Sequence, residues 1–476
     1  MARNFYRKVA FGIGPNQTIP ADPLKWAQAQ LDDVPALTWE GNIPTGDELL
    51  ERYGYFVYTR RKVLRPKFKK DRKGYEDAKR QLSFETGQRY YEDLELCIRH
   101  HAALHSGAPV FERLWLFWCN HFTISDKDFM PEFSTGPYHR ETIRAHLTGS
   151  FETLLKKVTL SWSMINHLDN SQSVGPNSKS GKWRAKNGKI ATVNENHARE
   201  LLELHTVSPA AGYSQKDVVA LSYVMAGWRT GYSKKRLECN PVKFDQEYHE
   251  PGNHKVLGKA YKQKGISPKN KLIDVLTDLA AYPHTRAFIA FKLCRHFICD
   301  EPTEEMMAPI IKAWEESDGH LPAIHKALVK VVYDHHQSQV KFQMPEIWLL
   351  QMANMTGASW PPSPKDMVYD FKTRPTDTHK RVSNTLEDLG HPPYRAKQPI
   401  GFPETKAEWL SPELLIRRLV FSKSFARFKA KDLDVQKMVK DNFENSDEIL
   451  QELADINPAF GQHLHYIFPS AWMLTA

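Results

Sequence analysis

Apolar side chains recur every three or four residues through most of the chain, and this spacing is the strongest constraint on the fold. A period of 3.6 residues gathers such side chains on one face of an α-helix. Ser214, Thr303 and Ser411 each stand where an N-cap would begin one of these helices. The segments with this spacing are Leu94–Leu104, Phe111–Phe122, Phe151–Leu160, Ala198–Leu204, Val218–Trp228, Leu272–Tyr282, Arg286–Phe297, Met306–Trp314 and Leu414–Phe421.

Alternation with a period of two residues, which is typical of strands, is rare in this sequence. The best example is Lys255–Tyr261, which predicts a short hairpin. The fold class predicted is therefore mainly α: a large multi-helix bundle with little β-structure, at most a short hairpin.

The length allows one large core or several smaller ones. A chain of 476 residues with 12 Trp and 41% hydrophobic side chains can bury a sizeable interior. We expect a single large helical domain over residues 1–476, with a sub-boundary at 355–380 where prolines cluster. Residues 59–80 are predicted to be a basic, irregular insertion, and Asn170–Lys189 a second irregular stretch, because both have few apolar side chains.

Charge and cysteine content restrict the partners. The net charge of +9, spread over this length, is a modest bias toward anions and argues against a nucleic-acid partner. Five scattered cysteines without a CxxC pair predict free thiols. No apolar stretch is long enough for a signal peptide or a membrane span. We expect a cytoplasmic protein, or a periplasmic one if a leader has been removed.

The densest polar cluster lies between Asn194 and Thr206. On a helix, Glu200 and Glu203 lie one turn apart, and Glu195 can pair with Arg199. Two carboxylates at this spacing are half of a helix-borne metal centre. The alternative is a solvated helix face held by the Glu195–Arg199 pair.

Three further groups contain candidate residues. Asn120 and His121 follow an aromatic run, and a histidine in that position is either a core side chain bonded to a backbone carbonyl or a ligand or base. His249 lies in a turn and is either another metal ligand or exposed. Lys292, Arg295 and His296 project from one helix, where a charged exterior stripe is the simpler interpretation.

Common catalytic signatures are absent from the sequence. There is no GxxxxGK[ST], HExxH or GxSxG motif, and no GxGxxG follows a strand. Nucleotide-driven and serine-hydrolase chemistry are therefore disfavoured.

Ordered blocks along the chain resemble the bacterial domain-of-unknown-function 1800 family. The similarity begins at Arg7–Pro15 and continues beyond Trp409; its main blocks are Glu112–Phe122, Met164–Asn177, Asn194–His205, His249–Gly252, Lys292–Phe297, Lys341–Glu346 and Gly401–Pro403. The resemblance implies a mainly helical protein, often encoded beside a sulfatase-like partner, and supplies no reaction. Phe402 stands where relatives usually have Trp, and many relatives are exported.

Two hypotheses about function follow. In the first, the protein is a metal-dependent enzyme, hydrolytic or oxidative. The metal ion, Zn, Mn or Fe, is bound by His121, Glu200, Glu203 and His249. Arg199 holds an anionic group of the substrate, and Asn120 and Glu195 orient the metal ligands. In the second, it is a non-catalytic binding or assembly protein that acts with the sulfatase-like partner, and the same residues form a structural polar network.

Overall fold

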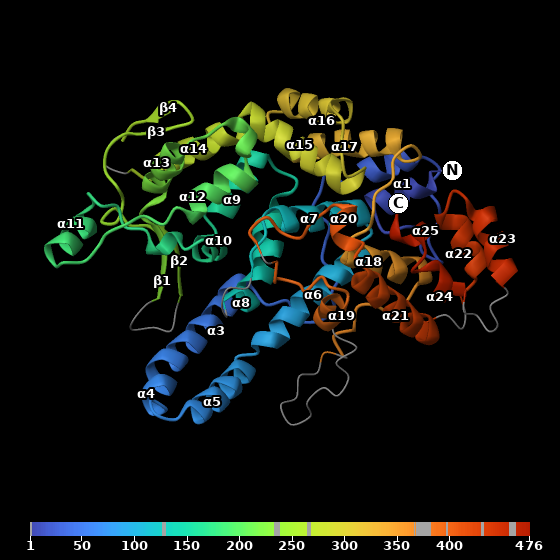
Figure 1. Ribbon diagram of the computed structural model, residues 1–476, viewed down its shortest axis with the longest axis horizontal. Helices are drawn as coiled ribbons and strands as arrows, with labels where there is room; N and C mark the ends of the chain where they lie inside the picture. The colour runs from blue at the N-terminus through green and yellow to red at the C-terminus, as the bar shows by residue number, and fades with distance from the viewer. Residues whose placement is uncertain are drawn as a thin grey trace.

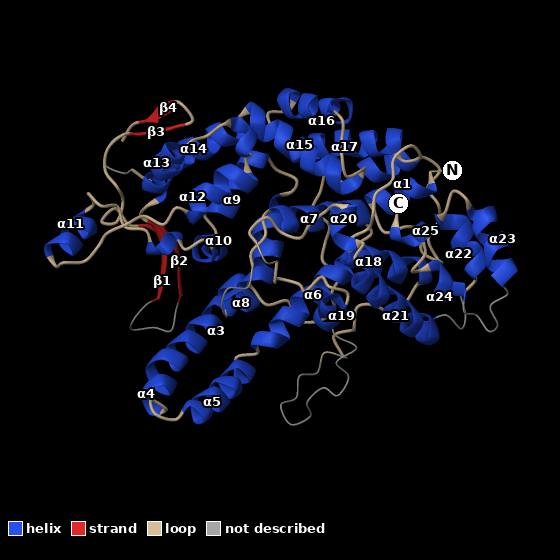
Figure 2. Ribbon diagram, in the orientation of Figure 1, coloured by secondary structure: helices blue, strands red, loops and turns tan. Residues whose placement is uncertain are grey.

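The computed structural model describes residues 2–125, 130–232, 239–263, 268–365, 367, 382–396, 398–429, 433–456 and 463–476. Within them the chain is mainly α-helical, as predicted (Figure 2). The α-helices of the first half are α1 (Arg3–Val9), α2 (Pro23–Gln28), α3 (Gly46–Tyr58), α4 (Arg65–Lys67), α5 (Arg72–Glu85), α6 (Gln88–His105), α7 (Pro109–His121), α8 (Met130–Pro137), α9 (Phe151–Thr159), α10 (Trp162–His167), α11 (Lys179–Lys186), α12 (Asn196–Glu200) and α13 (Gln215–Met225).

The α-helices of the second half are α14 (Asn270–Ala280), α15 (Pro283–Phe297), α16 (Glu304–Glu316), α17 (Leu321–His335), α18 (Pro345–Thr356), α19 (Val382–Asp388), α20 (Lys406–Trp409), α21 (Pro412–Lys429), α22 (Val435–Asn442), α23 (Ser446–Ile456), α24 (His463–Ile467) and α25 (Ala471–Leu474). The short 3₁₀ or π turns are η1 (Thr59–Leu64), η2 (Tyr138–Ile143), η3 (Arg144–His146), η4 (Asn170–Gln172), η5 (Leu201–His205) and η6 (Pro209–Ala211). Each of the nine segments with helical spacing coincides with one or more of these elements.

Two antiparallel hairpins make up the β-structure of the described residues. The predicted one pairs β3 (His254–Val256) with β4 (Lys259–Tyr261) and is confirmed. The other pairs β1 (Trp228–Tyr232) with β2 (Cys239–Phe244) and is a second short hairpin that the sequence did not indicate. Trp228 lies at the end of a helical apolar pattern, but in the structure it pairs with Phe244 in the antiparallel ladder and its ring packs against that of Phe244.

Local capping determines where several helices begin. Ser214 and Asp217 form a capping box at α13, in which each side chain bonds the other's backbone N–H. Thr303 accepts a hydrogen bond from the backbone N–H of Met306 at α16. The N-caps predicted at Ser214 and Thr303 are therefore confirmed.

The interior is built around α7, where almost every side chain is buried. Trp115 and Trp118 on this helix are among the largest fully buried side chains, and each indole N–H is satisfied. Trp115 donates to the carbonyl of His139 at 2.8 Å, and Trp118 donates to Nε2 of His325 at 3.0 Å. An aromatic helix can be buried on all sides when neighbouring helices cover each face and accept these protons.

The first helix and the last residues of the chain lie side by side (Figure 1). Arg7, which is fully buried, donates from Nη2 to the carbonyls of Trp472 and Met473 at 2.8 and 3.3 Å. The backbones of Lys341 and Ala476 exchange two hydrogen bonds of 2.7 and 2.9 Å. The chain ends are thus part of the packed structure.

The basic stretch 59–80 is helical, which corrects the irregular insertion expected from the sequence. It forms η1, α4 and most of α5, and with α3 it makes a hairpin that projects from the body (Figure 1). Asp71 caps α5 through a 2.8 Å bond from the backbone N–H of Gly74, and Lys79–Glu76 and Arg80–Asp77 pair along it. Caps and i,i+3 pairs hold a helix that buries little apolar surface.

Asn170–Lys189 is likewise partly helical, containing η4 and α11. Most of the 355–380 region lies outside the described residues, so the sub-boundary and the single domain stay predictions. Over the described residues, no helix has both the length and the apolar character needed to cross a bilayer.

Candidate functional site

A cleft of about 600 Å³ opens between α15 and the segment 390–409. Its walls combine aromatic rings with cations and carboxylates. The residues that matter for its chemistry are Phe288, Lys292, Arg295, Phe402, Glu404 and Trp409. A volume of this size, lined by apolar side chains with a few polar ones, is typical of a site for a small organic molecule.

A smaller cavity of about 50 Å³ lies behind the cleft, against α7 and α18. Phe402 lines both hollows, so its ring stands between them. The polar residues that line the cavity are Arg99, Cys119, Asn120, Thr123, His139, His296, Glu346, His391 and Tyr394.

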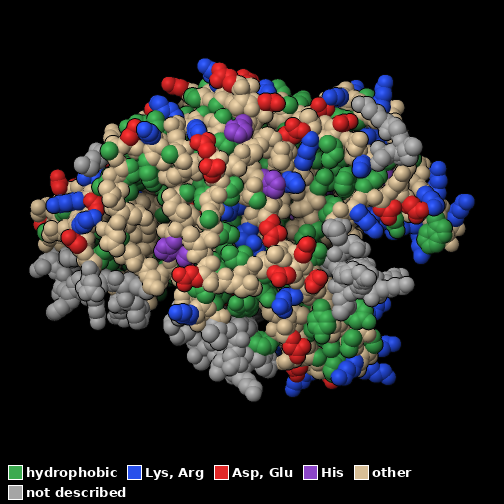
Figure 3. All heavy atoms as spheres, turned by 180° about the vertical axis from the view of Figure 1, so that it is seen from behind, with side chains coloured by type: hydrophobic (Ala, Val, Ile, Leu, Met, Phe, Trp, Pro, Cys, Tyr) green, Lys and Arg blue, Asp and Glu red, His purple; other side chains and the backbone are tan. Residues whose placement is uncertain are grey.

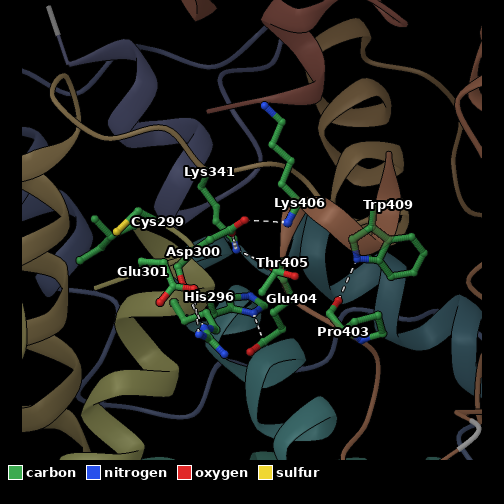
Figure 4. Close-up of polar contacts among 12 residues, drawn as sticks. His296, Cys299, Asp300, Glu301, Lys341, Pro403, Glu404, Thr405, Lys406 and Trp409 are labelled. Atoms are coloured by element: carbon green, nitrogen blue, oxygen red, sulfur yellow. Dashed lines mark hydrogen bonds and ion pairs between the residues drawn. The ribbon is translucent and has the colours of Figure 1, made fainter. Parts of the chain in front are cut away.

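His296 and Glu404 form a dyad at the wall between cavity and cleft (Figure 4). Nδ1 of His296 lies 2.6 Å from Oε1 of Glu404, and both side chains are buried. Burial lowers the pKa of His296 to about 4. Burial alone would raise the pKa of Glu404, but His296, Lys292 and Lys341 together lower it to about 2.

These shifts fix the protonation of the dyad near neutral pH. Glu404 is ionised and accepts the proton on Nδ1 of a neutral His296, so the lone pair of the imidazole is on Nε2. That nitrogen is buried and makes no hydrogen bond within the described residues. A histidine oriented by a carboxylate, with its other nitrogen free, is the arrangement of a general base.

The segment that contains Glu404 is held in place by Lys341 and Asp300 (Figure 4). Nζ of Lys341 donates to the backbone carbonyl of Glu404 and lies 2.6 Å from Oδ1 of Asp300. Oδ2 of Asp300 accepts the backbone N–H of Lys406 at 2.7 Å. Trp409 closes the turn by donating to the carbonyl of Pro403 at 2.8 Å.

Lys292 lies in the cleft without a partner. Its Nζ makes no hydrogen bond or ion pair with any described residue, whereas Arg295 one turn away bonds the carbonyl of Asp300 at 2.9 Å. Burial lowers the pKa of Lys292, although Glu404 partly offsets this. Lys292 therefore forms no direct ion pair with a described residue, although the Glu404 carboxylate is close enough to affect its pKa, and such a poorly solvated cation favours the entry of an anion.

A buried ionic network forms the far wall of the cavity. Oε1 of Glu346 lies 2.5 Å from Nη2 of Arg99 and 3.0 Å from Nε2 of His100. The indole of Trp360 donates to Nδ1 of His100 at 2.9 Å, so the imidazole carries its proton on Nε2 and donates it to Glu346. Arg99 and His100 outweigh the burial of Glu346 and lower its pKa.

Asn120 fixes the position of Phe402, the ring between the two hollows. Its Nδ2 donates to the Phe402 carbonyl at 3.0 Å and its Oδ1 accepts the Phe402 N–H at 2.7 Å. Gly401 precedes this contact with φ of +86°, and a Cβ there would lie 2.5 Å from the carbonyl oxygen of Asn120. Only glycine tolerates both the angle and the approach.

Of the residues predicted for catalysis, Asn120 alone lines the cavity or the cleft. Glu195 and Arg199 form a 3.1 Å pair on a partly exposed surface, completed by Gln215, which donates to Glu195 at 2.6 Å and accepts from Arg199 at 2.9 Å. This geometry matches the alternative of a solvated helix face.

The four predicted metal ligands have separate surroundings. His121 is buried against Phe117 and Phe122, with Nε2 3.4 Å from the carbonyl of His205. Glu203 accepts the hydroxyl of Tyr213 at 3.0 Å.

His249 donates from Nδ1 to the carbonyl of Ala226 at 2.7 Å, which ties it to the end of α13. Glu200 lies on α12, where the helix changes to the π turn η5. Over the part of the chain that the structure describes, no group of three or more His, Cys, Asp or Glu side chains is arranged to hold a metal ion. The metal site stays a prediction.

The sequence contained part of the signal for this site. Lys292, Arg295 and His296 were singled out, but the exterior stripe expected for them is wrong at His296, which is 4% exposed. Glu404 and Glu346 were not singled out, because each is a lone acid in its own segment. Only the fold brings Glu404 to His296, which is 108 positions away along the chain.

The fold and this site define a mainly helical protein with a polar, histidine-containing cavity behind an aromatic, cationic cleft. Over residues 4–464 the chain matches the family described as "Protein of unknown function (DUF1800)", and it belongs to that family. No curated protein and no solved structure matches the chain.

Proposed function

We propose that the protein binds a small organic molecule with a carboxylate group in the cleft, and that His296 serves as the proton-accepting group of the site. The observation that supports the proposal is the presence of two unsatisfied groups in adjoining hollows. Lys292 offers a cation in the cleft that forms no ion pair with a described residue, and Nε2 of His296 offers a lone pair in the cavity behind it.

The charges of Lys292 and Glu404 determine what each side chain would do in the site. The ligand carboxylate would neutralise Lys292, and its apolar body would lie against Phe288, Phe402 and Trp409. A group of the ligand that passes Phe402 into the cavity could give its proton to Nε2 of His296. The carboxylate of Glu404 would stabilise the imidazolium that forms.

Thermal unfolding in the presence of succinate, citrate and inorganic phosphate tests the binding step. We expect at least one carboxylate to raise the Tm of the wild type, and Lys292→Met to lose that rise. Lys25→Met is the matched control, because Lys25 is exposed on α2 and has no ion pair with a described residue. Equal shifts in all three proteins, or no shift with any probe, would contradict the proposal.

The metal-dependent enzyme, hydrolytic or oxidative, is a separate prediction. It requires the imidazoles of His121 and His249 and the carboxylates of Glu200 and Glu203 to bind Zn, Mn or Fe. Elemental analysis of the purified protein, repeated on His121→Ala, tests it directly. A sulfatase-like partner is also a prediction, and co-purification of the two proteins would test it.

A further inference from the structure

The helical hairpin formed by α3, η1, α4 and α5, here called the arm, has a tip that is exposed on all sides. No residue of η1 or α4 is buried, and in α5 only Leu82 is. The tip is distant from the cleft and is drawn well away from the body in Figure 1. Leu64 is the side chain of η1 that packs against the hydrophobic core, whereas the basic side chains of the tip are exposed or half-buried.

Nearly all of the net charge of the protein is concentrated at this tip. Residues 59–73 contain nine basic side chains and one acid, Asp71, a net charge of +8, whereas the whole chain has +9. The other 461 residues therefore sum to +1. The basic residues are Arg60, Arg61, Lys62, Arg65, Lys67, Lys69, Lys70, Arg72 and Lys73.

Apart from Arg60, these cations have no carboxylate partner among the described residues. In that part of the chain the ion pairs found in the arm are Lys79–Glu76 and Arg80–Asp77, and both lie beyond the tip. Arg60 lies over the ring of Phe56, and the remaining eight basic side chains form no ion pair with any described residue. Cations held close together repel one another, so this cluster favours an anionic partner.

Apolar side chains are exposed among the cations. Tyr55, Tyr58 and Val63 are 44%, 47% and 46% exposed, and Leu64 and Phe68 are half-buried. Figure 3 shows the arm at the lower right, with hydrophobic side chains between Lys and Arg. Aromatic and aliphatic groups framed by Lys and Arg are typical of segments that enter the interface of a lipid bilayer.

We propose that the tip of the arm docks end-on to a bilayer of anionic phospholipids. The cations occupy nearly consecutive positions over η1, α4, the link at residues 68–71 and the start of α5, so they point to different sides of the tip and not along one face. An extended anionic plane can engage all of them at once. A nucleic acid is less well matched, because phosphate contacts need cations along one groove or stripe.

Lipid phosphates would attract the basic side chains, and Val63 and Tyr58 would enter the headgroup region between them. Each Lys or Arg near such a surface strengthens binding by roughly a factor of five. Removal of three cations should therefore weaken binding by about 100-fold, and charge reversal by more.

Co-sedimentation of the full chain with vesicles tests the proposal. We expect binding to vesicles of phosphatidylcholine with about 30 mol% phosphatidylglycerol, and little binding to phosphatidylcholine alone. The triple variant Arg61→Glu, Lys62→Glu, Lys69→Glu should bind at least about 100-fold more weakly. Wild-type binding that is equal on both kinds of vesicle, or absent from the anionic ones, would overturn the proposal.

Two further variants separate the arm from general charge and from pure electrostatics. Lys25→Glu, Lys423→Glu, Lys440→Glu removes the same charge from other exposed positions and should keep the binding. Val63→Asn should weaken the binding that persists at high salt, where surface charges are screened. Equal losses in both triple variants, or tighter binding of duplex DNA than of anionic vesicles, would show that the arm is not a lipid-docking element.

Discussion

The His296–Glu404 dyad makes a quantitative prediction about stability in acid. The perturbation is Glu404→Gln, which keeps an oxygen that can accept the proton on Nδ1 of His296 but removes the charge. Glu404 has its pKa lowered from the ordinary 4.5 to about 2. At about 1.4 kcal/mol for each tenfold change, this corresponds to a stabilisation of the folded state by about 3 kcal/mol at neutral pH.

The pH range of this effect follows from the direction of the shift. A carboxyl group whose pKa is lower in the folded state contributes all of its stability above the unfolded value. The contribution of Glu404 should therefore be complete above pH 4.5 and disappear as the pH falls toward 2. Glu404→Gln should cost up to about 3 kcal/mol at neutral pH and progressively less below pH 4.5.

Urea unfolding, followed by tryptophan fluorescence at several pH values, measures this difference. Glu408→Gln is the control. Glu408 lies four residues after Glu404 in the same segment, is exposed, and accepts a hydrogen bond from the hydroxyl of Thr405. We expect the control to change the free energy of unfolding by less than about 0.5 kcal/mol. A loss in Glu404→Gln that is the same at pH 7 and in acid would refute the ionised dyad.

Three other substitutions test the close approach at Gly401, the buried ion pair of Arg99 and the buried amine of Lys8. Gly401→Ala should destabilise the protein by about 1–3 kcal/mol in urea unfolding, and by more than Gly188→Ala, which has a similar positive φ but nothing within 4 Å of the added Cβ. Arg99→Met should cost about 3–5 kcal/mol in the same assay, because it leaves Glu346 buried without its strongest partner. Burial lowers the pKa of Lys8 from 10.5 to about 7, so the unfolded chain binds more protons between these values and stability should rise with pH across them. Lys8→Met should flatten that rise in thermal unfolding measured from pH 7 to 10, and an unchanged slope would contradict the assignment.

Periodicity predicted the helices because the information is local. Each of the nine segments contains its own apolar face, and caps such as Ser214 and Thr303 lie beside the helices that they start. Residues 59–80 were predicted to be irregular because they contain few apolar side chains, and helix α5 within them depends on its cap Asp71 and on ion pairs one turn apart. A low apolar content is therefore a poor guide to helicity in a projecting segment.

The site could not be predicted in the same way because its groups come from distant segments. The Glu200 and Glu203 spacing was a sound local pattern, but it shows only that two acids share a helix. Glu404 gains its role from His296, and Glu346 from Arg99, at separations of 108 and 247 positions. Which histidine meets which carboxylate is decided by helix packing, which a single sequence does not encode locally.

The contact between Arg7 and the carbonyls near residue 473 has a kinetic consequence. It joins groups 465 and 466 positions apart, so closing it requires a loop that includes nearly the whole chain. Closing such a loop lowers the conformational entropy of the chain before the contact contributes any favourable energy. Proteins rich in contacts between distant residues therefore fold slowly. During synthesis, the guanidinium of Arg7 can meet these carbonyl acceptors only after the 464 residues between Arg7 and Trp472 have been made.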